Sequence, residues 1–463
     1  MDLTRYFQAI WPHIGTLVGF GLAFILIARL MSEKRRPSNT FAWFLIIILV
    51  PYVGVPLYIL FGGRKISQRS QDKSRINLSA EDLHHNATRT AFGIRAEGNR
   101  TQFIHTGTDA FNTLIDQIRG AKTSIHITTF ILSHDTIGRR IVHELAKRAR
   151  EGIQVRLLLD ALGSFGKKTF YMRELEQAGG TIERFMPILP FVTPSRANLR
   201  NHRKMAIFDK RRAIIGGHNI GRDYMGPVPA SKRWKDFGVL VEGPSVHQFN
   251  TIFEADWSFA QKRIALHNNQ IPSFPEETNT HNSSIEIMAS GPDTSGDPLY
   301  EKIISVIQEA QKSITIVTPY YIPDEVLQRS LIVKARSGKN VTLIVPRKSN
   351  HRITDLARGH FLRELVTAGA NIMLHMEGMV HGKIVLVDNA IAMTGSANVD
   401  FRSLFVNYEI GAFFYTKSDI EEFENWIQAR LESSVPYNSI YNKPRTLLRE
   451  TAEDLSRLLT PLL

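Results

Sequence analysis

Two short stretches of the chain repeat the same set of reactive side chains. Each stretch has a histidine, a lysine two residues later and an aspartate five residues after the lysine. They are His202, Lys204 and Asp209 in the first stretch and His381, Lys383 and Asp388 in the second. An imidazole can attack an electrophile or move a proton, and an ammonium group neutralises an anion. Two such sets would suit displacement at a phosphate diester, with one histidine attacking phosphorus and the other protonating the departing alkoxide.

The repetition of this pattern is more informative than either copy alone. A single histidine within a strand is usually a structural residue, and one short motif arises by chance in many chains. Here both copies also have an asparagine ten residues after the aspartate, Asn219 and Asn398. The duplication therefore favours a catalytic role for both sets.

Each motif reads as a β-hairpin with the aspartate at the first position of the turn. If Asp209 faces Arg212, and Asp388 faces Ile391, alternation of side chains places the polar residues on one face of each hairpin. The predicted clusters are His202, Lys204 and Asn219 in the first copy and His381, Lys383, Ser396 and Asn398 in the second. The asparagines and Ser396 are predicted to donate hydrogen bonds to the phosphate, and the aspartates to lie at the turns on the opposite face.

Each imidazole also needs a carboxylate that fixes its tautomer. Asp236 in "RWKDF" and Glu409 in "VNYEI" follow the histidines of their own copies, so the sequence predicts the pairs His202 with Asp236 and His381 with Glu409. A carboxylate that accepts from Nδ1 leaves Nε2 available for attack or proton transfer.

The surroundings of the two motifs are repeated as well. "AKTSIHITTFILS" from Ala121 matches "AQKSITIVTPYYI" from Ala310, and "MRELEQAGG" matches "LRELVTAGA". Short β-branched runs alternate with amphipathic helices that end at glycine, which predicts α/β domains with a largely parallel sheet. The expected division is an N-terminal hairpin at 1–66, a linker at 67–98, repeats at 99–261 and 285–415, a linker at 262–284 and C-terminal helices at 416–463. Those helices are expected to pack on the protein's own surface.

The N-terminal residues are strongly apolar. Two segments, Trp11–Met31 and Pro37–Gly63, are each long enough to cross about 30 Å of hydrocarbon, and the second has no charged residue. They predict a transmembrane hairpin rather than a cleaved signal peptide or a pair of buried helices. Basic residues beside both segments favour a cytoplasmic location for the remainder.

Composition narrows the class of partner. The chain has 463 residues, a formal charge of +13 and no cysteine. The positive charge favours polyanions, either nucleic acid or an anionic lipid surface, and the apolar N-terminus favours lipid. Thiol chemistry is excluded, no metal-binding spacing recurs between the copies, and there is no nucleotide-binding loop. Neither a metal nor a cofactor is expected.

These motifs resemble the phospholipase D superfamily, whose signature HxKxxxxD occurs twice per active site. The chain further resembles bacterial cardiolipin synthases in "RRPSNTFAWFLIIILVPYVGVPLYILFG", "NLRNHRKMAIFD", "TGSANVDFRSLFVNYE" and "LSRLLTPLL". The likeness covers nearly the whole chain. It departs at Gly382, where alanine is common, and at Phe237, where threonine is common and where a change could alter the choice of acceptor.

The resemblance implies two repeats packed about a pseudo-twofold axis around one phosphate. It also implies that His202 is the nucleophile, forming a phosphatidyl-histidine, and that His381 is the acid and then the base. Two phosphatidylglycerols would give cardiolipin and glycerol at the bacterial cytoplasmic membrane, without nucleic acid as a partner. The near symmetry of the two copies leaves the reverse assignment of the histidines open.

Three other readings remain open from the residues themselves. Water could take the phosphatidyl group instead of a lipid alcohol, which would make the protein a hydrolase. A nuclease would use the basic surface as a nucleic-acid groove, although an apolar N-terminus suits lipid better. A catalytically inactive lipid-binding scaffold is disfavoured because both motifs are complete.

Overall fold

The computed structural model describes residues 21, 23–28, 30–31, 37–62, 87–89, 93–164, 169–186, 198–261, 282–441 and 453. The chain divides into two compact units, one formed by residues 1–66 with 187–199 and the other by residues 67–186 with 200–463. The second unit contains both sequence repeats.

The strands of the second unit form two matching sets. Those of the first set are β2 (Ile94–Ile104), β3 (Ser124–Thr129), β4 (Gln154–Asp160), β5 (Thr181–Phe185), β6 (Met205–Phe208), β7 (Arg212–Gly216) and β8 (Gly238–Glu242). Those of the second set are β9 (Ser283–Ser290), β10 (Ser313–Val317), β12 (Asn340–Pro346), β13 (Asn371–His375), β14 (Ile384–Val387), β15 (Ile391–Gly395) and β17 (Glu409–Phe414).

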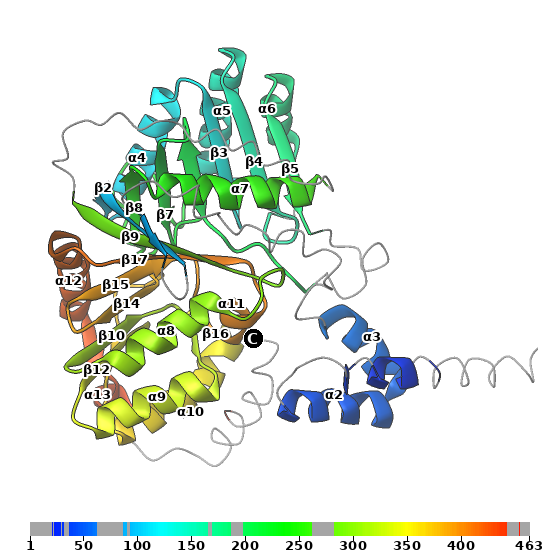
Figure 1. Ribbon diagram of the computed structural model, residues 1–463, viewed down its shortest axis with the longest axis vertical. Coiled ribbons are helices and arrows are strands. Elements are labelled where there is room, and N and C mark those ends of the chain that lie inside the picture. Colours follow the sequence, from blue (N-terminus) through cyan, green and yellow to red (C-terminus); the bar gives the residue numbers. More distant parts are fainter. Residues whose placement is uncertain are drawn as a thin grey trace, which may run out of the picture. The chain divides into compact units, whose positions relative to one another are not determined.

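The order of these strands shows the internal symmetry (Figure 1). Outward from the centre, one half runs β2-β8-β7-β6-β3-β4-β5 and the other β9-β17-β15-β14-β10-β12-β13. The two halves join through antiparallel pairing of β2 with β9. Each strand therefore has a counterpart in the other half, which confirms the two predicted α/β repeats. The remaining strands β1 (Ala87–Arg89) and β18 (Ser434–Pro436) extend the sheet, and β11 (Tyr321–Ile322) pairs with β16 (Val399–Asp400).

The sheet is more mixed than the sequence predicts. Within each repeat only three neighbouring strands run parallel, namely β3, β4 and β5 in the first and β10, β12 and β13 in the second. The other pairings of this large sheet, including both hairpins that carry the motifs, are antiparallel. The expectation of a largely parallel sheet was wrong because the helix-linked strands make up less than half of each repeat.

Helices cover the sheet on both faces. In the first repeat they are α4 (Gly107–Gly120), α5 (Thr136–Arg150), α6 (Arg173–Gln177) and α7 (Val246–Ala260), and in the second α8 (Pro298–Glu309), α9 (Glu325–Arg336), α10 (Arg352–Thr367) and α12 (Lys417–Glu432). Strand β3 shows how the faces are divided. Ile125 and Ile127 join the core beneath α4 and α5, while His126 between them stacks on Phe253 of α7 with 4.7 Å between ring centroids.

Helix α12 belongs to this packed structure. It follows β17 as α7 follows β8, and it buries Ile420, Phe423 and Trp426. Packing of this C-terminal helix on the protein's own surface is thereby confirmed. Beyond Tyr441, the C-terminal segment apart from Glu453 lies outside the described residues, as do most of both predicted linkers. The proposed domain boundaries stay predictions.

The turns of the two hairpins differ from the predicted ones by one residue. Phe208 faces Arg212 and Met205 faces Ile215, so the connection has three residues and Lys204 aligns with Gly216 rather than Gly217. The second hairpin has the same register, with Val387 opposite Ile391. The reason is a left-handed backbone at two consecutive turn residues, with φ of 53° and 56° at Asp209 and Lys210 and of 53° and 50° at Asp388 and Asn389. Aspartate and asparagine tolerate this conformation better than most residues.

The motif aspartates hold these turns to the adjacent strands. The Asp209 carboxylate accepts hydrogen bonds from the backbone N–H groups of Lys122, Thr123 and Ser124 at 2.7–3.1 Å. Asp388 accepts the equivalent bonds from residues 311–313, each at 2.7 Å. Their position at the turns, away from the imidazoles, agrees with the hairpin prediction. Their grouping with the catalytic side chains needs correction, because these carboxylates are used by backbone at the far end of the hairpin.

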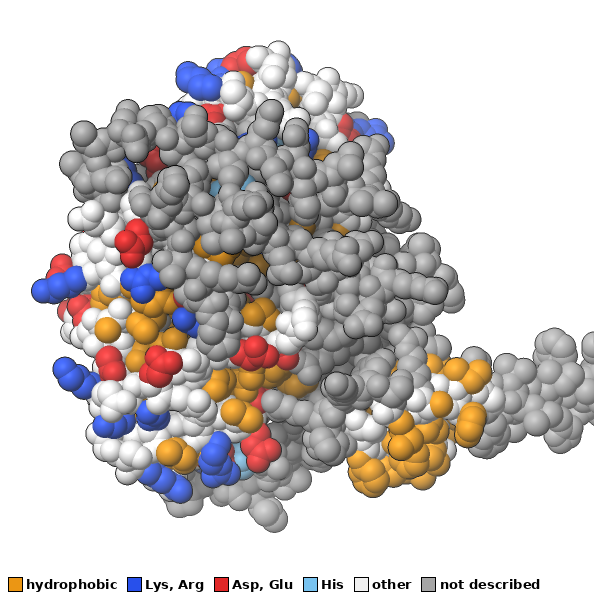
Figure 2. All heavy atoms as spheres, viewed as in Figure 1, with side chains coloured by type: hydrophobic (Ala, Val, Ile, Leu, Met, Phe, Trp, Pro, Cys, Tyr) orange, Lys and Arg blue, Asp and Glu red, His pale blue; other side chains and the backbone are white. Residues whose placement is uncertain are grey.

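The N-terminal unit contains α2 (Pro37–Leu49) and α3 (Pro51–Phe61). The sequence predicts one span over Pro37–Gly63, but the structure interrupts it at Val50, where Pro51 begins a new helix. The two helices pack closely, since a side chain on Gly54 would meet the Ile46 carbonyl oxygen at 2.4 Å. Among the described residues, no helix combines the length and apolar character needed to cross a membrane. Figure 2 shows apolar side chains gathered on the surface of this unit. Phe41 is 62% exposed and Leu49 is 72% exposed.

Candidate active site

Both histidines lie where the two repeats meet. The segment that leads into β6 pairs with the second repeat through Asn201 and Tyr408, and His202 N donates to the Tyr408 carbonyl at 2.9 Å. The segment that leads into β14 pairs with the first repeat in the equivalent way. There His381 N donates to the Lys235 carbonyl at 2.7 Å. The backbone of each motif is thus positioned by the other repeat.

The imidazoles are held by carboxylates across this boundary. His202 Nδ1 lies 2.8 Å from Glu409 Oε1, and His381 Nδ1 lies 2.5 Å from Asp236 Oδ2. Each carboxylate fixes the tautomer with the proton on Nδ1. The sequence identified both carboxylates but paired them within their own repeats, and that pairing was wrong. Order along the chain cannot show that Lys235–Asp236 and Tyr408–Glu409 each extend across the boundary.

The carboxylates themselves have different supports. Ser396 Oγ donates to Glu409 Oε2 and accepts from Ile410 N at 3.0 Å. Its hydroxyl is therefore engaged with the carboxylate, so its predicted role as a phosphate donor is corrected. Gly217 occupies the matching place in the first repeat. A Cβ there would lie 2.1 Å from Asp236 Oδ1, which instead accepts from Phe237 N at 2.9 Å.

Aromatic rings form the walls around the imidazoles. Phe130 packs edge-on against His202, with ring centroids 4.9 Å apart. His381 lies against two rings, Tyr224 at 5.3 Å and Trp234 at 5.0 Å. The side chain of His202 is 13% exposed and that of His381 is 5% exposed. His202 is thus the more accessible of the two from solvent. These rings were not predicted, because their sequence positions carry no repeated signal.

The two motif lysines place their amines beside the histidines. Lys204 Nζ donates to the His202 carbonyl at 2.8 Å. Lys383 Nζ donates to the His381 carbonyl at 2.5 Å and lies 2.9 Å and 3.0 Å from the two ring nitrogens. Burial lowers the pKa of Lys204 to about 7 and that of Lys383 to about 8. Such weakly solvated ammonium groups are suited to an anionic ligand.

Electrostatic coupling joins the two halves into one site. Lys383 of the second repeat lowers the pKa of both His202 and Lys204 of the first, while Asp236 and Glu409 each raise that of Lys204. Burial and the Lys383 ammonium lower the pKa of His381 to about 3, and burial also lowers the pKa of His202. Without a ligand, both imidazoles are therefore neutral near pH 7.

Both carboxylates remain ionised despite their burial. Burial alone would raise the pKa of Asp236, but His381, His218 and Lys383 together hold it below its usual range. The same balance applies to Glu409, whose pKa His202, Lys204 and Ser396 lower. A carboxylate kept charged in this way can stabilise an imidazolium when one forms.

The two motif asparagines have different contacts. Asn219 Oδ1 accepts from Ile131 N at 3.2 Å, and its side chain also bonds to Tyr224. Asn398 bonds to Asp400 through its side chain, while its buried Oδ1 has no hydrogen-bond partner among the described residues. Their predicted role as phosphate donors stays a prediction.

Phe237 and Gly382, the two positions at which the sequence departs from the family pattern, lie at one aromatic cluster. Phe237 is fully buried against Phe103, Phe423 and Trp426, with ring centroids 4.8–5.9 Å apart. Gly382 leaves room for the same indole, because a Cβ there would lie 2.7 Å from Trp426. Phe237 and Gly382 therefore serve packing between α12 and the repeats.

A buried arginine adds a second connection between the repeats. Arg203, between His202 and Lys204, forms an ion pair with Asp256 and donates to the carbonyls of Glu409 and Ser290, each at 3.1 Å. It therefore positions the backbone of Glu409, the residue that holds the neighbouring His202. No repeated signal points to this residue, because Gly382 stands in the equivalent place of the second motif.

Comparisons with known proteins agree with this geometry. Residues 114–257 and 303–431 match the family described as "Cardiolipin synthase, PLD-like domain", and residues 21–63 match "Phospholipase_D-nuclease N-terminal". A cardiolipin synthase from Oceanobacillus iheyensis is 31% identical, over 96% of this chain and 98% of its own. The major cardiolipin synthase of Bacillus subtilis is 32% identical, with 96% of each chain covered.

A solved structure shows the same fold. Phosphatidylserine synthase from Haemophilus influenzae superposes with a TM-score of 0.59 at 17% identity, over 78% of this chain and 95% of its own. At this identity the likeness concerns the fold alone. It agrees with the two-repeat architecture described above.

Proposed function

This chain belongs to the cardiolipin synthase family with phospholipase D-like domains, and we propose that it transfers a phosphatidyl group from one phosphatidylglycerol to another. The products would be cardiolipin and glycerol. The observation that carries the proposal is the crossed pairing of His202 with Glu409 and of His381 with Asp236. Two oriented imidazoles and two buried lysines at one boundary are the groups that exchange at a phosphodiester requires.

His202 is the proposed nucleophile. Its Nδ1 is held by Glu409, and its side chain is the more exposed of the two imidazoles. Attack of its Nε2 on phosphorus would form a phosphorus–nitrogen bond and break the bond from phosphorus to the glycerol oxygen. The result is a phosphatidyl-histidine.

His381 is the proposed acid and base. Its pKa is lowered chiefly by burial and then by Lys383, and a bound phosphate diester would attract that ammonium and favour protonation of the imidazole. Protonated His381 would give its proton to the departing glycerol. It would then take a proton from the headgroup hydroxyl of the second phosphatidylglycerol as that oxygen attacks phosphorus and releases His202.

The buried lysines would neutralise the diester. Lys204 and Lys383 are only 3% and 1% exposed to solvent, so little water screens their charge from a bound anion. As negative charge builds on the phosphate oxygens in the transition state, the two ammonium groups would stabilise it. Asn219 and Asn398 are the further donors that we propose for these oxygens.

We also propose that residues 1–66 attach the protein to the bacterial cytoplasmic membrane, with the catalytic repeats on the cytoplasmic side. Support comes from the uncharged stretch over 37–63 and from the exposed apolar side chains of α2 and α3. Extraction of membranes with alkaline carbonate tests the attachment, since a peripheral protein would be released. Protease treatment of intact spheroplasts tests the orientation, because repeats on the outer face would be cleaved.

Product analysis tests the reaction. Purified full-length protein is incubated with phosphatidylglycerol labelled in its glycerol headgroup, without nucleotide. Cardiolipin and free labelled glycerol in equal amounts support transfer. Phosphatidic acid without cardiolipin would identify a hydrolase instead. The net charge of +13 makes labelled DNA a useful further substrate to exclude.

A further inference from the structure

The two carboxylates that hold the histidines have different polar neighbours. Gly217 and His218 follow β7, and Ser396 and Ala397 occupy the same two places after β15. In the second repeat Ser396 donates to Glu409, and Ala397 is buried without a polar side chain. In the first repeat the serine position is a glycine and the alanine position is a histidine. Glu409 therefore has its polar neighbour at the first of these two positions, Ser396, whereas Asp236 has its polar neighbour at the second, His218.

His218 is close to Asp236. Asp236 Oδ1 lies against Gly217, the residue next to His218, and a Cβ on Gly238 would lie 3.3 Å from His218 Nδ1. The ring is thus confined between the end of β7 and the beginning of β8, with Asp236 just before β8. The buried His218 Nε2 has no hydrogen-bond partner in the part of the chain that the structure describes. Nothing in the catalytic steps above uses this imidazole.

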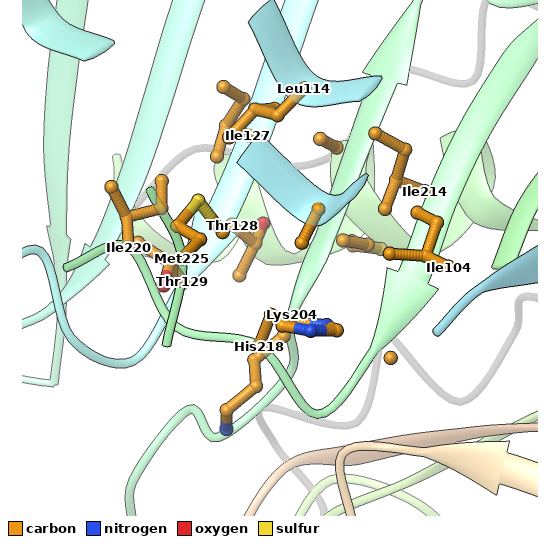
Figure 3. A pocket seen from close by; sticks show the side chains of 14 residues that line it. Ile104, Leu114, Ile127, Thr128, Thr129, Lys204, Ile214, His218, Ile220 and Met225 are labelled. Atoms are coloured by element: carbon orange, nitrogen blue, oxygen red, sulfur yellow. The ribbon is translucent and has the colours of Figure 1, made fainter. Parts of the chain in front are cut away.

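A small cavity lies beside His218. Its volume is about 50 Å³, and Lys204 shares its lining with His218 (Figure 3). The rest of the lining is apolar or threonine, as with Ile127, Thr128 and Ile214. His218 therefore stands between this apolar space and the charged groups of the site.

We propose that His218 is a positioning residue for Asp236, and through it for His381, and that it makes this half of the site sensitive to pH. The inference rests on the proposed phosphatidyl transfer. Ser396 serves Glu409 with a hydroxyl that does not titrate near neutral pH, so the His202 half lacks this sensitivity.

The charged groups around His218 set the direction of the effect. They are Asp236 before β8, Lys383 before β14, Asp109 on α4 and Lys204 before β6. Burial lowers the pKa of His218, while Asp236 acts in the opposite direction. The ring is therefore neutral at neutral pH. On acidification it gains a positive charge that competes with His381 for Asp236.

Two substitutions separate this role from packing. His218→Phe keeps a ring but removes both nitrogens, and His218→Gln keeps polarity but cannot titrate. Because His218 is charged only on acidification, both variants remove a positive charge that competes with His381 for Asp236 at low pH. We therefore expect the acidic limb of the kcat profile to extend to lower pH by roughly half a pH unit in both variants. We also expect kcat to fall about fivefold in His218→Phe and less in His218→Gln, with KM nearly unchanged.

His126→Phe is the matched control. His126 is a buried histidine of the same repeat that stacks on Phe253, and its ring nitrogens lie near Gln154 and Glu254. This variant should keep the wild-type pH profile even if its thermal stability falls. Activity is measured as total consumption of phosphatidylglycerol, so that transfer and hydrolysis both count.

The outcomes are distinct. An active wild type with unchanged acidic limbs in both His218 variants would overturn this inference and leave the proposed function standing. If His218→Phe does not fold, the limb of His218→Gln decides alone. A wild type that consumes no phosphatidylglycerol would overturn the proposed function itself.

Discussion

The two repeats share a topology but treat their histidines differently. His202 lies beside one aromatic ring, with Glu409 and Ser396 behind it, whereas His381 lies between Tyr224 and Trp234 against Lys383. A symmetric fold thus presents two unequal imidazoles to one site. The difference suggests how a duplicated domain can supply a nucleophile from one copy and an acid from the other.

The crossed carboxylates make this division depend on assembly. Neither repeat contains a complete histidine–carboxylate pair, because Glu409 holds His202 and Asp236 holds His381. A single repeat would leave its imidazole without the group that fixes its tautomer. Formation of the boundary between the repeats therefore completes both halves of the site.

Removing either histidine should have the largest effect. We expect His202→Ala and His381→Ala each to reduce kcat by about 10⁴-fold or more, and the double variant to be no worse than the more impaired single one. Non-additive losses are typical of groups that act on one reaction. The measurement is cardiolipin formation, with vesicle binding as the control. Substantial turnover by either single variant would show that the other repeat works alone.

The carboxylate variants should distinguish crossed pairing from pairing within a repeat. Glu409→Gln and Asp236→Asn should each slow the reaction of phosphatidylglycerol by about 10²- to 10⁴-fold, because the imidazoles lose their orienting charge. A phosphatidyl ester of p-nitrophenol needs no acid for its leaving group. The burst of p-nitrophenol should therefore return to near the wild-type rate in Asp236→Asn and stay slow in Glu409→Gln.

The reverse result has an equally clear meaning. A restored burst in Glu409→Gln with a slow burst in Asp236→Asn would mean that each carboxylate serves the other imidazole, or that the histidine roles are exchanged. His202→Ala separates these possibilities, since loss of the nucleophile abolishes the burst.

The lysines should couple activity to pH. Lys204 and Lys383 have pKa values near 7 and 8, so kcat/KM should fall as pH rises through this range and the free site loses positive charge. Lys204→Met should reduce kcat/KM by roughly 10²- to 10³-fold at neutral pH. The pH profile of kcat/KM for the wild type and this variant is the measurement. A wild-type profile that is flat to about pH 9 would contradict the assigned role.

The charge of Lys204 should lower the stability of the folded protein in the same pH range in which it supports activity. Its pKa is about 7 in the folded protein against 10.5 ordinarily, so the folded state binds fewer protons between these values. By linkage, the destabilisation due to the buried charge is greatest below about pH 7 and is relieved as pH rises through that window. Lys204→Met should therefore unfold at higher temperature than the wild type near pH 6, with a smaller difference near pH 9. Lys210→Met, an exposed neighbour in the turn, is the control.

The turn aspartates should affect activity least. Asp209→Ala removes an acceptor of three backbone hydrogen bonds and places alanine at a φ of 53°. We expect a loss of about 2–3 kcal/mol in the free energy of unfolding, with kcat per folded molecule within a few fold of wild type. Urea unfolding and active-site titration measure the two quantities. Asp223→Ala, at an exposed aspartate, should change neither quantity. A loss of kcat in Asp209→Ala comparable to that in His202→Ala would show that Asp209 takes part in catalysis.

Much of the fold follows from the sequence because it is encoded twice. The repeated strand and helix patterns predict two α/β repeats, and the histidines and carboxylates of the site are present among the predicted residues. The predicted register of the hairpins differs from the observed one by one residue, because two left-handed residues make the turn one residue longer than the two-residue turn that the pattern favours. Asp209 and Asp388 were the available signal, since aspartate is among the residues that tolerate this conformation.

The remaining differences come from contacts between the repeats. Three features depend on how the surfaces of the two repeats meet. They are the pairing of Glu409 with His202, the hydrogen bond from Ser396 to Glu409 and the hydrogen bond from Arg203 to the Glu409 carbonyl. Periodicity and spacing describe each repeat separately and carry no information on the contacts between the repeats. The sequence contains a signal for the interruption of the second apolar segment at Pro51, because proline lacks the N–H that a continuous helix needs.

Trapping the covalent intermediate tests the shared site most directly. His381→Ala is mixed with the p-nitrophenyl phosphatidyl ester labelled at phosphorus, which needs no acid to depart and leaves no base to activate the acceptor. We expect the label on the peptide that contains His202, and none on any peptide of His202→Ala treated in the same way. Equal labelling of His202 in one variant and of His381 in the other would show two independent nucleophiles and contradict a single phosphorus shared by both repeats.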